Sequence, residues 1–365
     1  MVSMEPYLDT VASILRDGQY KPNRTSRDTI SSFSQHYRVN LSSGFPLLTT
    51  KDLSGGRWET LVEEFEWYLS GNHHIRRFDL DNIWGYMTDK EDNLPTAYGR
   101  FWRRYPIPEQ TDQLDGEWWP EQDAAWFDDA RDMFNTTDEE LNTALDRWIN
   151  KEDDGRRTID QLQYVADTLN GNNPMREPES RRLVVNAWHP SNAIVSALPP
   201  CHYTFVFNVQ GDQLNAHLTQ RSGDIALGIP FNIAAYGMLT KAIAKQTPFD
   251  AGHFSHTVVD THAYCGSGDR GEWYGDNIDT VQSWLENVDS REEYLDVKQR
   301  IEEQAPEENT KGEDHVPRLL KQLSREPRER PTLEINGNPL EDDMRDAVEL
   351  KNYNPADSIY FDMAE

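Results

Sequence analysis

The chain has 365 residues, enough for one large domain or two ordinary ones, and carries a formal net charge of −28 at pH 7. Its 36 basic residues are ten lysines and 26 arginines. So acidic a surface repels nucleic-acid phosphates and disfavours nucleic-acid binding. High salt screens the self-repulsion of such a surface. The composition therefore predicts a halophile's protein, in which any anion site is a local arginine cluster.

Cysteine content and apolar runs predict a soluble protein of a reducing compartment. The two cysteines, Cys201 and Cys265, are too few for a disulfide framework or a zinc cluster. The N-terminus lacks a basic and then apolar signal segment, and no apolar run approaches the roughly twenty residues that span a bilayer. We therefore expect a cytoplasmic protein that binds neither a metal nor a membrane.

Apolar residues recur at helical spacing in three segments of the first half of the chain, residues 5–17, 57–70 and 158–170. The second helix should end at Gly71, and Thr158 is the expected N-cap of the third. Glu64 lies on the edge of the apolar stripe of the second helix. Partial burial there would raise its pKa and suit it to acid–base work. The alternative is a glutamate whose carboxylate reaches water.

Two segments differ from the rest of the chain in composition. Residues 106–157 and 266–314 hold many aspartates and glutamates, and the second has few apolar residues. We interpret both as acidic insertions in a single domain of residues 1–365, with solvated helix in at least the second.

The second half of the chain contains four segments typical of strands, residues 183–188, 203–209, 214–220 and 256–264. The period of two places Asp260, His262 and Tyr264 on one face of the last strand. Three aligned polar groups could bind a sugar or form a buried polar ladder. A helix that begins near Pro230 carries Asn232 in its first turn. The Asn232 amide could read the edge of a pyrimidine or be an ordinary first-turn amide.

Cys201 stands directly before the strand 203–209 and after two prolines that fix the backbone. A thiol held there could be a nucleophile, although a free cysteine is more often a small buried apolar side chain. Downstream, Arg221, Ser222 and Gly223 could cradle a phosphate with side chains and backbone N–H groups. The pair at 181–182 could be a phosphate clamp or a salt-bridged surface pair.

Together these motifs resemble the thymidylate synthase family. They follow the family's order and cover most of the chain outside the two acidic segments. The matching stretches are Asn23-Arg24-Thr25, Phe45 to Lys51, Glu64 with Trp67 and Gly71, Ile83-Trp84, Tyr98-Gly99, Ser180-Arg181-Arg182, Ala197 to His202, Gln220 to Asp224, Leu227 to Tyr236, Asp260 to Tyr264, Gln322 to Arg328 and Tyr353-Asn354-Pro355.

The resemblance implies a homodimeric enzyme that methylates dUMP to dTMP. Its co-substrate, 5,10-methylenetetrahydrofolate, would supply both the carbon and the hydride. The implied fold is α+β, a mixed and largely antiparallel sheet with helices on one face. The other face would pack against the sheet of a second subunit.

The resemblance also implies a role for each matching residue. Cys201 would add to C6 of the uracil ring, and Arg221 would lower the pKa of its thiol. The other catalytic residues would be Glu64, Tyr98, Arg221, Asp224 and Asn232. The nucleotide would be held by Arg24, Gln220, Arg221, Ser222, Asp224, Asn232, His262 and Tyr264, with Arg181 and Arg182 donated by the other subunit. The folate would contact Lys51, Ile83, Trp84, Leu198, Asp224, Gly228, Phe231 and Ala364. Gly85, Met87 and Glu365 depart from the family pattern on the folate side.

The nearest alternative is a deoxycytidylate hydroxymethylase of the same fold, and a further one is a nucleotide-binding protein without turnover. Cytosine presents an amino group and an unprotonated N3, which favour an aspartate at position 232. Asn232 instead matches uracil. A zinc nucleotide deaminase would need a second cysteine three residues after Cys201, where the sequence has Thr204.

Overall fold

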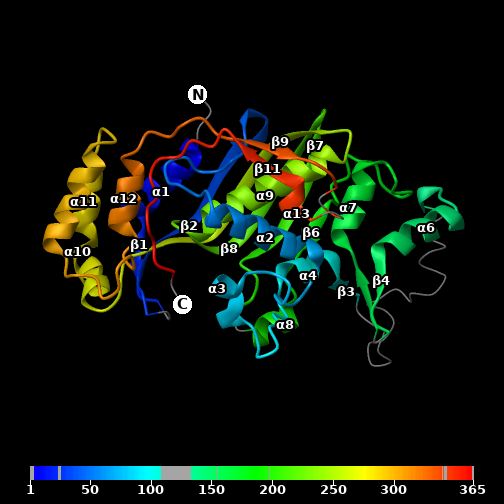
Figure 1. Cartoon of the computed structure of the whole chain (residues 1–365), viewed down its shortest axis with the longest axis horizontal. Helices are drawn as coiled ribbons and strands as arrows, with labels where there is room; N and C mark the ends of the chain where they lie inside the picture. Colours follow the sequence, from blue (N-terminus) through cyan, green and yellow to red (C-terminus); the bar gives the residue numbers. More distant parts are fainter. Residues whose placement is uncertain are drawn as a thin grey trace.

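Six strands form a mixed sheet at the centre of the computed structural model, which describes residues 4–23, 26–107, 133–153, 155–196, 198–338, 340 and 343–363 (Figure 1). In spatial order the strands are β1 (Gln19–Lys21), β2 (Thr29–Asn40), β9 (Asp250–Tyr264), β8 (Gln213–Asp224), β7 (His202–Gln210) and β6 (Val184–Asn186). Neighbouring strands are antiparallel, except that β8 and β9 are parallel. The predicted α+β class is therefore confirmed.

Helices and two small sheets complete the described fold. The helices are α1 (Glu5–Asp17), α2 (Gly56–Ser70), α3 (Asp81–Trp84), α4 (Tyr98–Arg103), α6 (Asp138–Trp148), α7 (Gln161–Leu169), α8 (Pro190–Val195), α9 (Gly228–Lys245), α10 (Asp269–Leu285), α11 (Glu293–Gln304), α12 (Val316–Leu323) and α13 (Met344–Ala347). The short strands β3 (Tyr105–Pro106), β5 (Arg157–Ile159) and β4 (Ile149–Lys151) form one small sheet, and β10 (Thr332–Ile335) pairs with β11 (Val348–Lys351). None of the helices within these ranges is both long and apolar enough to cross a membrane.

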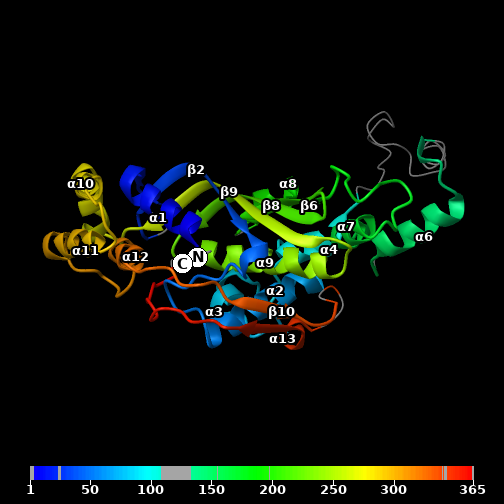
Figure 2. The same cartoon turned by 90° about the horizontal axis from the view of Figure 1, so that it is seen from above.

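Helix α9 covers one face of the central sheet and lies between the sheet and α2 (Figure 2). In β8 the side chains alternate between buried and partly exposed, and the buried set includes Leu214, Leu218 and Gln220. This alternation follows from the period of two of a strand that is covered on one face. Because Gln220 belongs to the buried set, it lies on the face that α9 covers.

Most of the predicted elements are present, and two boundaries differ. Helix α2 ends at Gly71, which adopts φ 69° as the left-handed cap. Thr158 was the wrong choice of cap for the third helix, since it lies in β5. The cap is Asp160, whose Oδ1 accepts the N–H of Gln163 at 2.9 Å. Strand β8 also continues through Asp224, so part of the expected phosphate cradle is strand.

Gly99 allows the start of α4 to pack directly against α2. A Cβ atom at position 99 would lie 1.9 Å from the carbonyl oxygen of Tyr68, which excludes every other residue without backbone movement. The close approach fixes the preceding residue, Tyr98, beside Tyr68, with their rings 5.3 Å apart. A site residue is thus placed by a neighbouring glycine.

The described parts of the two acidic segments lie at opposite ends of the molecule (Figure 1). Residues 133–157 contribute α6, β4 and β5 at one end, and 266–314 contribute α10 and α11 at the other. Helix α11 buries only Val297 and Ile301, so the predicted solvated helix is confirmed there. Their interpretation as insertions into one domain stays a prediction.

Candidate active site

Cys201 lies directly before β7 on a turn that two other elements hold. Its backbone N–H donates to the hydroxyl of Tyr98, in α4, at 3.0 Å. Arg221, in β8, donates from Nε to the carbonyl of Pro200 at 3.0 Å and from Nη2 to that of Pro199 at 2.7 Å. The backbone N–H of Arg221 also donates to the carbonyl of Cys201 at 2.8 Å. The half-buried thiol is therefore fixed relative to one cation and one phenol.

The pKa of the Cys201 thiol reflects two opposing effects. Burial raises it above its ordinary value, and the Arg221 charge and the Tyr98 hydroxyl lower it by less. The expectation that Arg221 lowers this pKa is therefore confirmed, but desolvation of the thiolate outweighs the nearby cation, so the net shift is upward. The thiol must give up a proton before it can act as a nucleophile.

The side chain of His202 packs and hydrogen-bonds in the core instead of pairing with the neighbouring thiol. Its ring stacks on Tyr98 at 3.5 Å between centroids, and its Nδ1 hydrogen-bonds the hydroxyl of Tyr236 at 2.7 Å. Burial lowers the pKa of His202 to about 3, so the ring is neutral at physiological pH. These contacts place the His202 ring in the core between Tyr98 and Tyr236.

Glu64 meets Trp84 and Tyr68 next to Tyr98. Its Oε1 accepts the indole N–H of Trp84 at 2.7 Å, and the Trp84 and Tyr98 rings are 6.0 Å apart. Burial raises the pKa of Glu64, although hydrogen bonds from Trp84 and Tyr68 partly oppose the shift. The raised pKa expected for this helix-edge glutamate is confirmed, and it suits a group that both accepts and returns protons.

The start of α9 and the end of β8 bring Asn232, Gln220 and Asp224 together. Asn232 donates from Nδ2 to Oε1 of Gln220 at 3.0 Å, and Oδ1 of Asp224 accepts the N–H of Ala226 at 2.8 Å. Burial alone would raise the pKa of Asp224, but His315, with Nδ1 3.6 Å from Oδ1, is the main cause that brings it below its ordinary value. Asp224 is therefore a partly buried carboxylate that stays ionised.

His262 and Tyr264 lie beside Asp224 in β9. Asp224 is the register partner of His262, and their ladder continues with the N–H of Ile225 donating to the carbonyl of His262 at 2.9 Å. The His262 and Tyr264 rings are 5.2 Å apart, and both side chains are partly exposed. Ser222 lies two residues before Asp224 in β8, opposite Asp260.

The residues expected to contact folate differ in how far they are buried. Ile83, Leu198 and Phe231 come from three different elements and are partly buried hydrophobics that pack against the core while keeping accessible surface. Gly228 begins α9. Lys51 is 2% exposed, donates from Nζ to the carbonyl of Ala226 and lies 4.8 Å from the centre of the Phe361 ring.

Four further expected residues are exposed or lie outside the described ranges. The side chains of Arg181 and Arg182 are exposed and precede β6, at the end of the β6–β7 pair that is remote from Cys201. Within one chain the structure does not bring them to the thiol. Arg24 and Ala364 lie outside the described residues.

The thymidylate synthase family model matches residues 5–365 of the chain. The chain belongs to the thymidylate synthase family. A thymidylate synthase of Haloferax volcanii is 54% identical over 366 residues, which cover 100% of this chain and 97% of that protein. The halophilic character expected from the charge fits this relative. The enzyme methylates dUMP to dTMP and uses 5,10-methylenetetrahydrofolate as its co-substrate.

Two residues that the sequence did not reveal link this group of residues to the C-terminal segment. His315 joins the carboxylate of Asp224 to the C-terminal segment, since its Nε2 hydrogen-bonds the carbonyl of Asp362 at 2.9 Å. Arg27 donates from Nη1 to the same carbonyl at 2.8 Å and from Nη2 to the Asp362 carboxylate at 2.5 Å. Arg27 and Asp362 are 335 residues apart, so no local pattern could link them.

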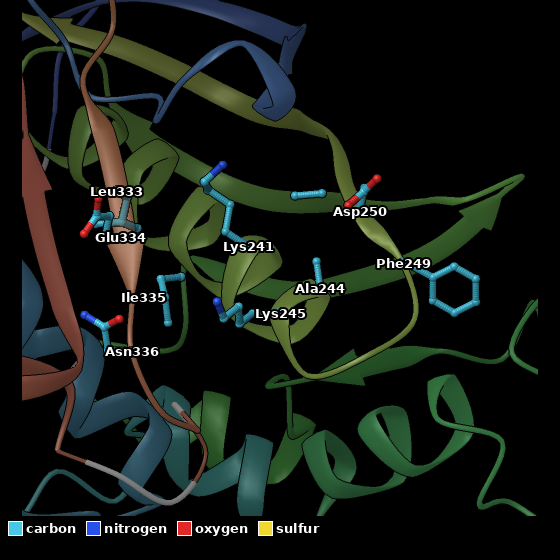
Figure 3. Close-up of a pocket in the computed structure, with 10 residues that line it drawn as sticks. Lys241, Ala244, Lys245, Phe249, Asp250, Leu333, Glu334, Ile335 and Asn336 are labelled. Carbon is cyan, nitrogen blue, oxygen red and sulfur yellow. The ribbon is translucent and has the colours of Figure 1, made fainter.

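A cavity of about 420 Å³ lies apart from these residues, between the end of α9, the start of β9 and β10 (Figure 3). Lys241, Lys245, Phe249 and Ile335 are among the residues that line it. None of its lining residues was predicted as a site residue. Among the described residues, no cluster of three or more His, Cys, Asp and Glu is arranged to hold a metal ion.

Replacement of Lys51 is expected to change how the thymidylate synthase responds to pH. Burial lowers the pKa of Lys51 from 10.5 to about 7, against the attraction of Asp224. Between these values the unfolded chain binds a proton that the folded chain does not, so stability rises with pH. Burial of the charged Lys51 lowers the free energy of unfolding by its full amount below pH 7. This destabilisation disappears as the pH rises towards 10.5. The free energy of unfolding can be measured in urea for the wild type and for Lys51→Met. The wild-type value should rise relative to the variant's by about 1.4 kcal/mol per pH unit between roughly pH 7.5 and 9.5. A difference that is independent of pH would contradict this assignment.

Proposed function

We propose that Cys201 is the nucleophile of dUMP methylation. Its thiolate adds to C6 of the uracil ring, the S–C6 bond forms, and the electron pair of the C5=C6 bond shifts to C5 and O4. C5 thereby becomes an enolate carbon that can take up a one-carbon unit. Removal of the C5 proton lets the folate nitrogen leave with its bonding electrons and creates an exocyclic methylene at C5. Hydride addition to that carbon completes the methyl group and re-forms the C5=C6 bond, so that the S–C6 bond breaks and the thiolate is restored. The observation that carries this proposal is the turn at Cys201, which Arg221 and Tyr98 hold between β7, β8 and α4.

Arg221 has two proposed tasks, to position the nucleophile and to bind phosphate. Its N–H groups on Nε and Nη2 anchor the turn. A guanidinium has five N–H donors, so others are left for the phosphate of dUMP. Ser222 and Arg24 of the same subunit would add a hydroxyl and a second cation. Such a local cluster is how a chain with a net charge of −28 can bind a dianion.

The remaining nucleotide contacts are proposed from the geometry around Asp224. Asn232 would read O4 and N3 of uracil, with Gln220 and the backbone of Asp224 in support. His262 and Tyr264, which are adjacent, partly exposed and polar, would bind the 3′-hydroxyl of the ribose.

Glu64 and Tyr98 are proposed to move protons. The raised pKa of Glu64 favours the exchange of protons near O4 of uracil and the folate. The Tyr98 hydroxyl lies within 3.0 Å of the Cys201 backbone N and therefore beside the expected position of the ring. It would assist removal of the C5 proton.

5,10-Methylenetetrahydrofolate supplies the one-carbon unit and the hydride when it is bound. We propose that its flat ring system lies against Trp84, Ile83, Leu198 and Phe231, over Gly228. Lys51, Asp224 and Ala364 are proposed to complete the folate site. The buried Lys51, with its pKa near 7, would gain a proton when an anionic ligand arrives.

The enzyme is proposed to be a homodimer that packs sheet to sheet, with 1–365 as a single domain. One face of β8 is buried beneath α9, while the alternate residues, such as His217 and Thr219, are only partly covered. Phe33 in β2 is 84% exposed, which is unusual for a large apolar side chain. A second sheet against this face would bury it. The need for a reduced Cys201 fits a cytoplasmic location.

Asn232→Asp is expected to lower activity with dUMP and to raise binding of dCMP. A carboxylate accepts from N4–H₂ of cytosine, whereas it leaves O4 of uracil without a donor. The change in relative kcat/KM should be about tenfold or more, from the cost of unpaired buried polar groups. Dihydrofolate formation, followed spectrophotometrically with dUMP and with dCMP in molar KCl, measures it. Unchanged selectivity in Asn232→Asp would refute the edge-reading role. A hydroxymethylase releases tetrahydrofolate and no dihydrofolate, so release of the C5 proton tests that alternative. Wild-type enzyme that releases the C5 proton from dCMP but not from dUMP would favour the hydroxymethylase.

A further inference from the structure

A continuous chain of hydrogen bonds connects Asn232 to two polar side chains in the core. Gln220 Oε1 accepts from Nδ2 of Asn232 at 3.0 Å and contacts Nε2 of His256 at 3.0 Å. His256 Nδ1 lies 2.6 Å from the hydroxyl of Tyr37. The four residues belong to β2, β9, β8 and α9, and Tyr37 is 5% exposed, His256 0% and Gln220 3%. Neither Tyr37 nor His256 was predicted as a site residue.

The donor and acceptor of every hydrogen bond in this network can be assigned from the chemistry of its groups. Gln220 donates from Nε2 to the carbonyl of Ser222 at 2.8 Å, so its Oε1 must be the atom that faces His256 and Asn232. An amide oxygen only accepts, so His256 carries its proton on Nε2. Nδ1 of His256 is then bare and accepts from the Tyr37 hydroxyl. Burial lowers the pKa of His256 to about 3, so the ring stays neutral and keeps one tautomer.

The fixed hydrogen-bond directions also determine which donor and acceptor Asn232 presents to the substrate. One Nδ2–H of Asn232 is used by Gln220, which leaves the second Nδ2–H and Oδ1 as one donor and one acceptor. Uracil offers the complement, with O4 as acceptor and N3–H as donor. Cytosine offers the reverse, an amino donor and a bare N3.

Accommodation of cytosine would therefore disturb the core. Asn232 would have to turn its amide and place Oδ1 against Oε1 of Gln220. Gln220 could turn in response only by losing its bonds to Ser222 and His256, and the tautomer of His256 opposes that turn. A buried polar network whose members are all satisfied resists such partial rearrangement.

We propose that Tyr37 and His256 are positioning residues that hold the Asn232 amide, through Gln220, in the direction that selects uracil over cytosine. The inference rests on the proposed role of Asn232. The two residues are register partners in β2 and β9, so the backbone itself keeps their side chains together. Two polar rings at this depth of an apolar core need a reason, and orientation of a substrate-reading amide provides one.

The test compares equilibrium binding of dUMP and dCMP, measured by calorimetry without folate. In Tyr37→Phe, His256 Nδ1 loses its donor and the other tautomer becomes accessible. In His256→Phe, Gln220 loses a donor altogether. Both changes should reduce the ratio of dCMP to dUMP dissociation constants by about threefold to tenfold, the range expected for one buried hydrogen bond. His256→Gln, whose amide can still donate to Gln220, should retain most of the preference.

Tyr274→Phe is the matched control, because it also loses a fully buried hydroxyl, one that donates to Asp314 at 2.8 Å. It should lose stability and keep the wild-type preference. ¹⁵N spectra of histidine-labelled wild-type protein provide a second readout, with the His256 signal assigned by its absence in His256→Gln. They should show the Nε2–H tautomer near neutral pH.

Three results distinguish a failure of this proposal from a failure of the proposed role of Asn232. An Nδ1–H tautomer in the wild type would overturn the proposal whether or not the variants fold. A wild-type preference in folded Tyr37→Phe and His256→Phe would also overturn it, provided that Asn232→Asp shifts the preference. If Asn232→Asp leaves the preference unchanged, the proposed reading of uracil by Asn232 fails, and this inference fails with it.

Discussion

Cys201→Ser is expected to lower dTMP formation by more than about a thousandfold, because an uncharged hydroxyl is a far weaker nucleophile than a thiolate. The substitution removes little volume from the turn. The bonds that hold the turn run from Arg221 and Tyr98 to backbone groups, so they do not depend on the sulfur. Binding of dUMP should therefore stay within a few-fold of wild type. Dihydrofolate formation and equilibrium binding of dUMP measure the two effects separately.

Cys265→Ser provides the matched control for this prediction. Cys265 is 0% exposed, and burial, aided by Asp314 and Asp28, raises the pKa of its thiol well above the ordinary value. A thiol in that state is inert. The control should lose some stability and keep its turnover. Substantial dTMP formation by Cys201→Ser would rule out Cys201 as the nucleophile, and loss of dUMP binding would mean that the sulfur also supports the turn.

Local patterns predicted the elements around the site well. The periodicities of a half-buried strand and of an amphipathic helix can be recognised from residues that are close together in the sequence. Residues 5–17 and α1 share their bounds, and α2 ends at the predicted Gly71. The error at Thr158 arose because local signals alone do not choose between two possible caps. Thr158 and Asp160 are both good caps, and the pairing of Thr158 in β5, which is a tertiary contact, decided between them.

Electrostatics and long-range contacts could not be predicted in the same way. The sequence shows that Arg221 and Cys201 are cation and thiol, but the pKa of Cys201 depends on how much water the fold removes from it. Likewise, His256 appears in the sequence as one polar residue in a strand. Its importance appears only when β2, β8 and α9 bring Tyr37, Gln220 and Asn232 to it.

The exposed arginines at 181–182 gain a physical role from the register of β6 and β7. Val184 pairs with Val206, which is five residues along β7 from Cys201, or roughly 17 Å at about 3.4 Å per residue. The two arginines lie further from Cys201 still, because β6 runs antiparallel to β7. If they bind the phosphate beside Arg221, they must come from another subunit.

Mixed dimers should therefore recover activity that neither parent has. One parent carries Arg181→Ala with Arg182→Ala, and the other carries Cys201→Ser. In the mixed dimer, one site combines an intact Cys201 with intact arginines from its neighbour, and the second site holds both defects. Random pairing of equal amounts makes half of the dimers mixed, so about a quarter of wild-type activity is expected in a twofold-symmetric dimer. Differently tagged subunits, purified in tandem and assayed for dihydrofolate formation, give the mixed dimers directly.

A second mixture makes the result specific. Arg221 donates to the Cys201 turn of its own subunit, so Arg221 and Cys201 of one site come from the same subunit. Mixing Arg221→Ala with Cys201→Ser subunits leaves every site with one defect or the other, and no recovery is expected. Recovery in the first mixture but not in the second assigns the exposed pair to the partner's site. Purified mixed dimers of the first kind that stay inactive would remove the shared site, and the two arginines would then be surface residues of an edge strand.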